Sequence, residues 1–392
     1  MIAASLAGAR PRELAEVLVA HGWDDVRAEA AADGLGPIAL HLTEVPAAAV
    51  EALVQWNARA GLDLLTGPDW VVIAGSRSRV GALARPWTVP EPLAELAVAV
   101  GLALPPDAPT EWVMARGTIR CDVPVVVGIL NLTPDSFSDG GALPTVEAAV
   151  ARAERLLADG AAMLDLGGES SRPGAQPVTP DEETARVVPV IRALAERWPG
   201  VPLSVDTVKA SVAESALAAG AWAVNDVSGF RLDAALPAVV ARAGAGAILM
   251  HSRGSFSEMA TFDHATYESG VTPAVVRELA EGVARATGAG VGAAGIVVDP
   301  GFGFSKTAEQ NLELLDRLGA LGALGRPVLV GPSRKRFLGH VTGRDVHDRD
   351  RATAAACVLA YDRGARLFRV HEPAAVRDAL AVAHATGGAA CR

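Results

Sequence analysis

Short apolar runs recur along the chain from about residue 122 onward. Each run is followed by a polar or glycine-rich loop and then by a helical stretch rich in Ala, Leu and Arg. Strand-sized segments that alternate with helices predict parallel strands joined by right-handed crossovers. Eight such units over about 265 residues predict a (β/α)8 barrel. The predicted strands are residues 123–130, 161–166, 201–205, 221–224, 246–250, 295–298, 326–330 and 366–370.

The first 111 residues do not follow this repeat. Their apolar periodicity predicts strands over 38–45 and 69–75. It predicts helices over 11–23, 46–61 and 91–104. The Pro-rich segment 105–112, PPDAPTEW, is typical of a linker. The sequence therefore predicts a small α/β domain of unknown role over 1–111, followed by the barrel over 112–392.

Every predicted barrel strand ends at polar or charged residues. In barrels of this type the loops at the carboxyl ends of the strands carry the site, so we expect these side chains to meet at one rim. Arg369 and His371 are two residues apart, which puts both on one face of the last strand. The other strand ends are Asn131, the loop 167–175, Asp206, Asn225 with Asp226, His251, Asp299 and the loop 331–337.

The residue types at this rim indicate the kind of ligand. Asp206, Asn225 and Asp299 offer acceptors and one amide donor, which suits a flat heterocycle with several N–H groups and a carbonyl. A second set is cationic and suits a phosphate group. The sequence contains no G-x-S-x-G, H-E-x-x-H or C-x-x-C motif that would indicate a nucleophile or a metal hydrolase. The cationic set is Arg172, Lys335, Arg369 and His371.

Composition narrows the classes of partner. The chain has 392 residues and a net charge of -10, and phosphate-backbone binding needs a basic surface, so nucleic acid is excluded as a main partner. No apolar run approaches the roughly 18 residues that span a bilayer, and no signal peptide is expected at the start. Three scattered cysteines without metal spacing indicate a reducing cytoplasm. Of 35 basic residues only three are lysine, namely Lys209, Lys306 and Lys335.

Seven motifs, each at a predicted strand end and in one order, closely resemble those of dihydropteroate synthases. The resemblance covers residue 112 to about 387. It implies transfer of a 7,8-dihydropterin-6-ylmethyl group from its diphosphate to para-aminobenzoate, with release of pyrophosphate, in folate biosynthesis. The motifs are GILNLTPDSFSDGG (128–141), DLGGESSRPGA (165–175), SVDT (204–207), NDVSG (225–229), DPGFGFSKT (299–307), GPSRKRFLG (331–339) and RVH (369–371).

The resemblance also implies roles for individual residues. Pterin contacts are expected from Asp206, Asn225, Asp299 and Lys335. Diphosphate contacts are expected from Asn131, Arg172, Arg369 and His371, with Asn131 also binding Mg²⁺. Contacts to para-aminobenzoate are expected from Phe137, Ser171, Pro173, Phe304 and Arg336. Two loops, 132–141 and the one around 171–173, are expected to close over this substrate. The residues implied to be catalytic are Asp206, Asp299, Lys335 and Arg172.

The chain departs from the usual family pattern at several positions. Ser171 stands where Thr is common, and MHSRG (250–254) replaces MHMQG, which we expect to change the wall of the pterin pocket and add a charge near the mouth. Pro332 is expected to stiffen the loop before Lys335, and Arg336 stands where some members have Ser. These changes leave the fit of the second substrate and sulfonamide sensitivity open.

Two other functions share the predicted ring pocket. One is a methyltransferase that moves a methyl group from a reduced folate to a corrinoid protein, and the other is a non-catalytic pterin-binding paralogue. The resemblance further implies small-molecule substrates, no membrane partner and a homodimer through the outer barrel helices. Pyrophosphate release in the presence of both substrates and Mg²⁺ would separate the three functions.

Overall fold

The computed structural model describes residues 2–5, 17–20, 38–104, 109–133, 145–171 and 175–389. The chain forms two compact units. One contains Met1–Asp107 together with Tyr267–Arg277 and Gly319–Leu324. The other contains Ala108–Thr266, Glu278–Leu318 and Gly325–Arg392. The division between residues 111 and 112 that the sequence suggests stays a prediction.

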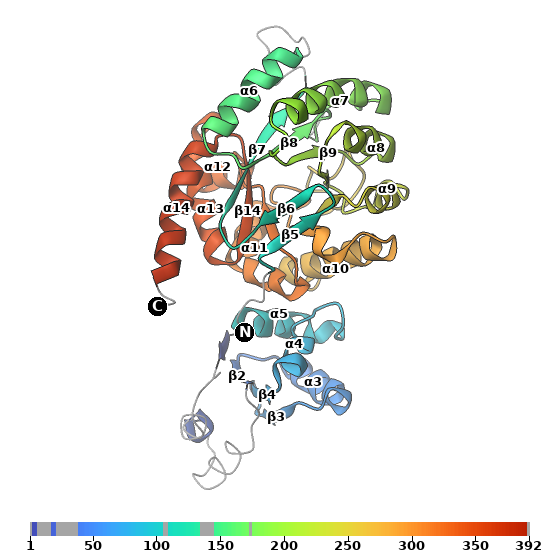
Figure 1. Ribbon diagram of the computed structural model, residues 1–392. Coiled ribbons are helices and arrows are strands. Elements are labelled where there is room, and N and C mark those ends of the chain that lie inside the picture. Colours follow the sequence, from blue (N-terminus) through green and yellow to red (C-terminus); the bar gives the residue numbers. More distant parts are fainter. Residues whose placement is uncertain are drawn as a thin grey trace. The chain divides into compact units, whose positions relative to one another are not determined.

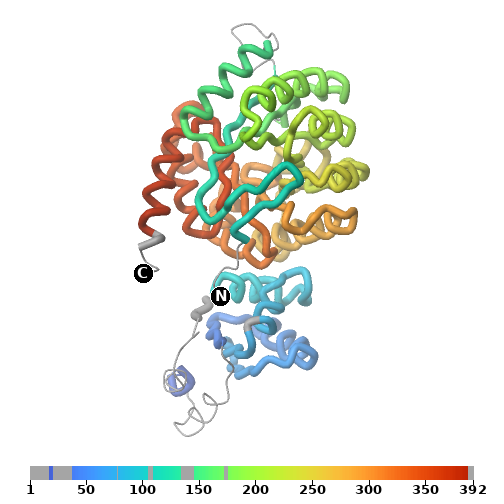
Figure 2. The backbone as a smooth tube through the Cα atoms, viewed as in Figure 1, coloured from blue at the N-terminus to red at the C-terminus, as the bar shows by residue number. Residues whose placement is uncertain are grey.

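Eight parallel strands form a closed barrel, which confirms the predicted fold (Figure 1). Each predicted run overlaps one of these strands, and most of the strands extend one or two residues beyond the predicted ends. The barrel closes where the last strand pairs with the first, with Leu367 opposite Val125 and Val370 opposite Gly128. Figure 2 follows the chain through this unit from green through yellow and orange to red. The strands are β7 (Val125–Asn131), β8 (Met163–Gly167), β9 (Leu203–Asp206), β10 (Ala223–Asp226), β11 (Gly246–Met250), β12 (Ile296–Asp299), β13 (Val328–Val330) and β14 (Ala365–Val370).

Helices surround the barrel and connect its strands. Two begin with the capping boxes that the sequence shows: the Thr179 hydroxyl accepts from the Glu182 amide at 3.3 Å, and that of Thr307 accepts from the Gln310 amide at 3.3 Å. The helices are α6 (Val146–Ala158), α7 (Pro180–Arg197), α8 (Ala210–Ala219), α9 (Leu236–Arg242), α10 (Val271–Gly288), α11 (Ala308–Asp316), α12 (Arg336–Thr342), α13 (Asp350–Asp362) and α14 (Pro373–Ala389). Short 3₁₀ turns are η3 (Ala293–Gly295), η4 (Leu318–Leu324) and η5 (Val346–Asp348).

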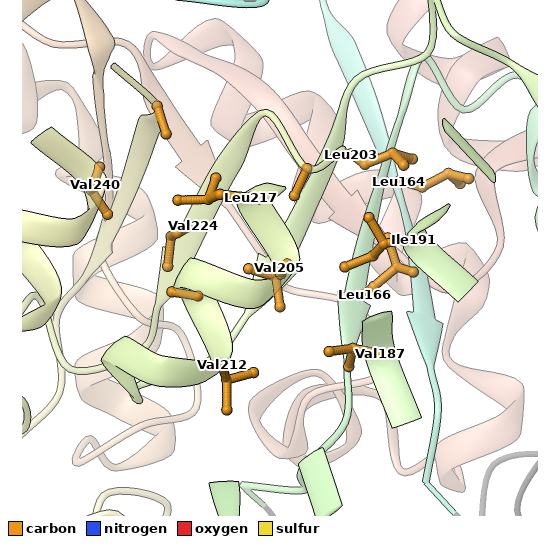
Figure 3. Close-up of a cluster of buried hydrophobic side chains, with 14 of the residues drawn as sticks. Leu164, Leu166, Val187, Ile191, Leu203, Val205, Val212, Leu217, Val224 and Val240 are labelled. Atoms are coloured by element: carbon orange, nitrogen blue, oxygen red, sulfur yellow. The ribbon is translucent and has the colours of Figure 1, made fainter. Parts of the chain in front are cut away.

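An apolar layer between the strands and the helices holds the barrel together (Figure 3). Leu166 of β8 and Val205 of β9 point outward and are fully buried, as are Val187 and Ile191 of α7 and Val212 of α8. Burying each such side chain stabilises the fold by about 1.5–3 kcal/mol relative to leaving it in water. This layer fixes the strand ends, on which the polar side chains stand.

A hairpin of β5 (Glu111–Met114) and β6 (Gly117–Arg120) packs against the amino ends of the barrel strands. The indole of Trp112 is fully buried and donates to the Gly295 carbonyl at 2.8 Å. The predicted linker over 105–112 is therefore wrong at its end, because Glu111 and Trp112 form a strand in the barrel unit. The opposite end of the barrel carries the polar residues.

The first unit contains an antiparallel sheet in the order β1-β2-β4-β3. The predicted strands over 38–45 and 69–75 and the helices over 46–61 and 91–104 are present, whereas most of the predicted helix over 11–23 lies outside the described residues. The sequence did not predict β1, β3 or α4. The elements are β1 (Ile2–Ser5), β2 (Ile38–Thr43), α3 (Ala47–Ala60), β3 (Asp63–Thr66), β4 (Trp70–Gly75), α4 (Arg77–Leu83), η1 (Glu91–Leu93) and α5 (Ala94–Ala103). Among the described residues, no helix has the length and apolar character to span a bilayer.

Candidate active site

The strand register brings three of the predicted site residues into one layer at the carboxyl end of the barrel. Asn131 is opposite Gly167, Gly167 is opposite Asp206, and Asp206 is opposite Asn225. A Cβ atom on Gly167 would stand 3.7 Å from the Asn131 Oδ1 atom and 3.6 Å from the Asp206 Cβ atom. The glycine therefore leaves room between an amide oxygen and a carboxylate.

Asp165 lies one layer deeper in the barrel, where the register places it opposite Ile129 and Ser204. Its side chain is fully buried and accepts from the Ser204 hydroxyl at 2.5 Å and from the Asn225 Nδ2 atom at 3.0 Å. It also accepts from the Arg369 Nε atom at 2.5 Å. Sequence reasoning missed Asp165 because it lies inside an apolar run. The signal was present, since a charged residue between Leu164 and Leu166 indicates a position that faces the barrel interior.

Arg369 joins Asp165 to Asp206. Its Nη2 atom donates to the Asp206 Oδ2 atom at 2.7 Å, so one guanidinium contacts two carboxylates. Burial alone would lower the pKa of Arg369, but Asp165 and Asp206 raise it above its ordinary value. The expected separation of acids from cations is therefore absent here. A buried guanidinium needs carboxylate partners, so Arg369 lies among the acids.

Burial raises the pKa of two acids in the site. That of Asp206 is raised to about 7 by burial and by the Asp165 charge, against the lowering effect of Arg369. That of Asp299 is raised to about 6 by burial, against the Gly301 amide, which donates at 2.7 Å, and the positive charge of Lys335. Burial thus disfavours the ionised form of both carboxyl groups, and the neighbouring cations favour it.

Lys335 comes from the loop after β13 and contacts the loop after β12. Its ammonium lies 4.0 Å from the centre of the Phe304 ring. Gly303 permits this contact, because its φ is +80° and a Cβ atom there would stand 2.8 Å from the Lys335 Cδ atom. Arg334 has a φ of 59° in the turn that presents Lys335, and it is held by Asp350 at 2.8 Å.

His371 is tied to the same loop. Its Nδ1 atom and the Ser333 hydroxyl are 2.9 Å apart, and its backbone amide donates to the same hydroxyl at 3.2 Å. The Arg152 guanidinium donates to its carbonyl at 3.0 Å. The end of β14, which carries Arg369 and His371, is thus joined to the loop that carries Lys335.

A buried polar chain supports the loop after β12, and it joins Lys306 to His251, which the sequence placed at the rim. The Lys306 ammonium donates to the His251 Nδ1 atom at 2.9 Å and to the Gly301 and Phe304 carbonyls at 3.1 and 3.0 Å. Burial lowers the pKa of Lys306 to about 7, and burial together with the Lys306 charge lowers that of His251 to about 4. The neutral imidazole then donates from Nε2 to Glu278 at 3.1 Å.

The two residues that depart from the family pattern after β11 both have partners within the chain. The Ser252 hydroxyl donates to the Val227 carbonyl at 2.7 Å. The Arg253 guanidinium contacts both Glu278 oxygens and donates to the Thr266 carbonyl at 2.6 Å. Burial alone would raise the pKa of Glu278, but hydrogen bonds from His251 and Arg253 hold it at about 2. The added positive charge of Arg253 is therefore compensated by Glu278.

The residues expected at the second substrate are described only in part. Ser171 is partly exposed at the edge of the described loop. The Arg336 guanidinium lies 4.4 Å from the centre of the Phe262 ring, beside a cavity of about 370 Å³ that Gly303 and His340 also line. Phe137, Arg172 and Pro173 lie outside the described residues.

A magnesium ion would fit Asn131 with few other protein ligands. No cluster of three or more His, Cys, Asp or Glu side chains suited to a metal occurs among the described residues. Mg²⁺ commonly takes one or two protein oxygens and completes its shell with water and substrate phosphates. The Asn131 amide oxygen next to the space over Gly167 suits that mode of binding.

Comparisons with known proteins agree with this geometry. Residues 127–371 match the model of a family described as pterin binding enzyme. A dihydropteroate synthase of Mycobacterium leprae is 44% identical over 263 residues, which are 66% of this chain and 91% of that protein. A structure of Xanthomonas albilineans dihydropteroate synthase with 4-aminobenzoic acid has a TM-score of 0.66 and 44% identity, and covers 71% of this chain and 98% of its own. Another from that organism, with 7,8-dihydropteroate, has a TM-score of 0.62 and 43% identity over 69% of this chain and 96% of its own. The chain belongs to the pterin-binding enzyme family and is a relative of the dihydropteroate synthases.

Proposed function

We infer that this chain acts as a dihydropteroate synthase, which joins para-aminobenzoate to 7,8-dihydropterin-6-ylmethyl diphosphate and releases pyrophosphate. The observation that carries this function is the cluster of Asp165, Asp206, Asn225 and Arg369 at one end of a closed barrel. The related enzyme structures with 4-aminobenzoic acid and with 7,8-dihydropteroate support the same substrates.

The ring of the pterin would bind among the acids. Asp206, Asn225 and Asp299 offer acceptors and one amide to its N–H groups and carbonyl, and the positive charge of Lys335 favours the ionised form of Asp299. As the leaving group departs from the methylene, positive charge spreads onto the ring. Carboxylates that are already held in place stabilise this charge without reorganising, which favours the transition state. No strong general base is needed, because the arylamine nitrogen carries its lone pair at neutral pH.

The diphosphate would bind to Asn131, Arg369 and His371, with Arg172 as a further candidate. Mg²⁺ at Asn131 would neutralise charge on the departing diphosphate. Arg369 already contacts Asp206, so it can stabilise the diphosphate while it remains paired with the acid that faces the ring. The arylamine would lie at Ser171, Phe304 and Arg336, with Phe137 and Pro173 as further candidates.

Pyrophosphate release tests this function. Purified protein with both substrates and Mg²⁺ should release pyrophosphate, and Asp206→Ala should abolish the release while the circular dichroism spectrum stays unchanged. Unchanged turnover in Asp206→Ala would refute the role of that carboxylate. Methyl transfer to a corrinoid protein without pyrophosphate would indicate the methyltransferase, and pterin binding without either reaction would indicate a non-catalytic paralogue.

A homodimer through the outer helices is part of the proposal. Leu359 of α13 and Val382 of α14 are 44% and 68% exposed, and the two helices pack against each other. A second copy of the chain would cover these apolar side chains. Light scattering should show a dimer, and Val382→Glu should weaken it. A monomer at all concentrations would overturn this part of the proposal.

We also propose a reducing cytoplasm as the site of action. Cys121 and Cys357 are buried free thiols, whereas Cys391 lies outside the described residues. Burial raises the pKa of Cys121 to about 12. Such thiols are unreactive at neutral pH and fit a protein that is not built around disulfides.

A further inference from the structure

Of the three lysines, Lys335 belongs to the site and Lys306 to the buried polar chain that supports the loop after β12. Lys209 belongs to neither. It lies three residues after Asp206, in the connection between β9 and α8. Its ammonium donates to Glu169 at 2.8 Å, to Glu183 at 2.6 Å and to the Val178 carbonyl at 2.6 Å. All three of its donor hydrogens are therefore used.

These contacts join both ends of the loop between β8 and α7. Glu169 stands at the start of this loop and Val178 at its end, and the Val178 amide donates to the second Glu169 oxygen at 2.8 Å. A direct hydrogen bond and a shared ammonium thus hold the same two residues together. Ser171, which we assign to the arylamine, is two residues from Glu169.

The start of the loop is also fixed to α7. The Arg186 guanidinium donates to the Gly168 carbonyl at 2.8 Å. A Cβ atom on Gly168 would stand 2.9 Å from Val187 and 3.0 Å from Glu183. Glu183 is buried, with 1% of its side chain exposed, so its carboxylate needs the Lys209 charge. The loop stem therefore has little freedom while Lys209 is present.

We propose that Lys209 is a positioning residue for the second substrate, which connects the strand that carries Asp206 to the stem of the loop that carries Ser171. This inference rests on the proposed function in one respect, namely that the arylamine binds at Ser171. Among the described residues, no hydrogen bond or ion pair joins Lys209 to Asn225 or Asp299. Its loss should therefore affect the two substrates differently.

Lys209→Met tests this proposal. Losing a charge-assisted hydrogen bond at the stem should raise the KM for para-aminobenzoate about tenfold or more. The Kd of the pterin substrate, measured by calorimetry without arylamine, should stay within about twofold of wild type, because the acid cluster is untouched. Lys209→Arg keeps the charge and should restore most of the arylamine KM. Arg192→Met, on the exposed side of α7, is the matched control and should change neither constant.

A second readout does not depend on turnover. Hydrogen exchange at residues 175–179 should become faster in Lys209→Met, whereas exchange in β10 and β11 should stay at the wild-type rate. If Lys209→Met does not fold, the double variant Lys209→Met with Glu183→Gln replaces it in both measurements. The second substitution removes the buried Glu183 charge that Lys209→Met leaves unpaired.

Several outcomes would overturn the proposal. One is a folded Lys209→Met protein whose KM for para-aminobenzoate stays within twofold of wild type. Another is a Kd for the pterin substrate that rises by the same factor as the KM for para-aminobenzoate. Unchanged exchange at the loop stem would also overturn it, even if wild-type protein released no pyrophosphate. Absence of pyrophosphate from wild type would by itself defeat only the proposed reaction, because the exchange experiment still decides the role of Lys209 at the stem.

Discussion

Removal of the Asp165 carboxylate is the sharpest test of how the site is built. Asp165→Ala leaves Arg369 with one carboxylate instead of two and removes the acceptor of the Asn225 amide and of the Ser204 hydroxyl. Breaking a buried ion pair costs about 3–5 kcal/mol, and each unsatisfied buried donor about 1–3 kcal/mol, so we expect a loss of at least about 3 kcal/mol. Asp165→Asn keeps an acceptor and should lose about half as much.

Thermal unfolding measures this loss. For a unit of this size about 1 kcal/mol corresponds to roughly 2–4 °C, so Asp165→Ala should lower the Tm by at least about 6 °C. The Kd of the pterin substrate should rise in both variants, because Asn225 loses the charged partner that orients it. Asp378→Asn is the control, since 72% of its side chain is exposed, and its effect should stay within about 0.5 kcal/mol. An Asp165→Ala protein within about 1 kcal/mol of wild type would refute the reasoning.

Three further predictions concern single residues. Burial raises the pKa of Asp206 to about 7. The protonated carboxyl group therefore contributes its full stabilisation below the unfolded-state pKa of about 4, and this contribution is lost as the pH rises through 7. From pH 5 to 8 urea denaturation should therefore show wild type losing stability relative to Asp206→Asn, whereas Asp263→Asn, an exposed control, should show no such slope. Trp112→Ala should lower the free energy of unfolding by about 3–5 kcal/mol in the same assay and leave the KM values unchanged. A raised KM for the pterin substrate would contradict a purely structural role for Trp112. Gly303→Ala should weaken pterin binding in calorimetry, because the new methyl group displaces Lys335; wild-type affinity would show that the loop adapts.

The barrel could be predicted because its signals are local. Each strand is a short apolar run followed by a polar residue, and the capping boxes at Thr179 and Thr307 mark where helices begin. The linker prediction failed at Glu111 and Trp112 because the Pro-rich composition of 105–112 indicated a linker, whereas a short strand begins at Glu111. Its burial depends on a long-range contact with Gly295, which no local pattern shows.

The partners within the site could not be predicted from strand ends alone. Arg369 was placed with the cations, yet it pairs with Asp165 and Asp206, because a guanidinium inside a barrel must be compensated by whichever carboxylates the register brings near. Arg253 is likewise compensated by Glu278, which is 25 residues away in the chain. Such pairings depend on distances across the fold.

By itself the sequence determined the eight strands, the end of the barrel that carries polar groups, and the family whose motifs these are. Only the tertiary structure decided that Asp165 is the central acid, that Lys306 supports the loop after β12, and that Lys209 joins two loop ends. The physical reason is that apolar periodicity is a local property of the sequence. A buried charge instead depends on partners that the closed barrel brings together from separate strands.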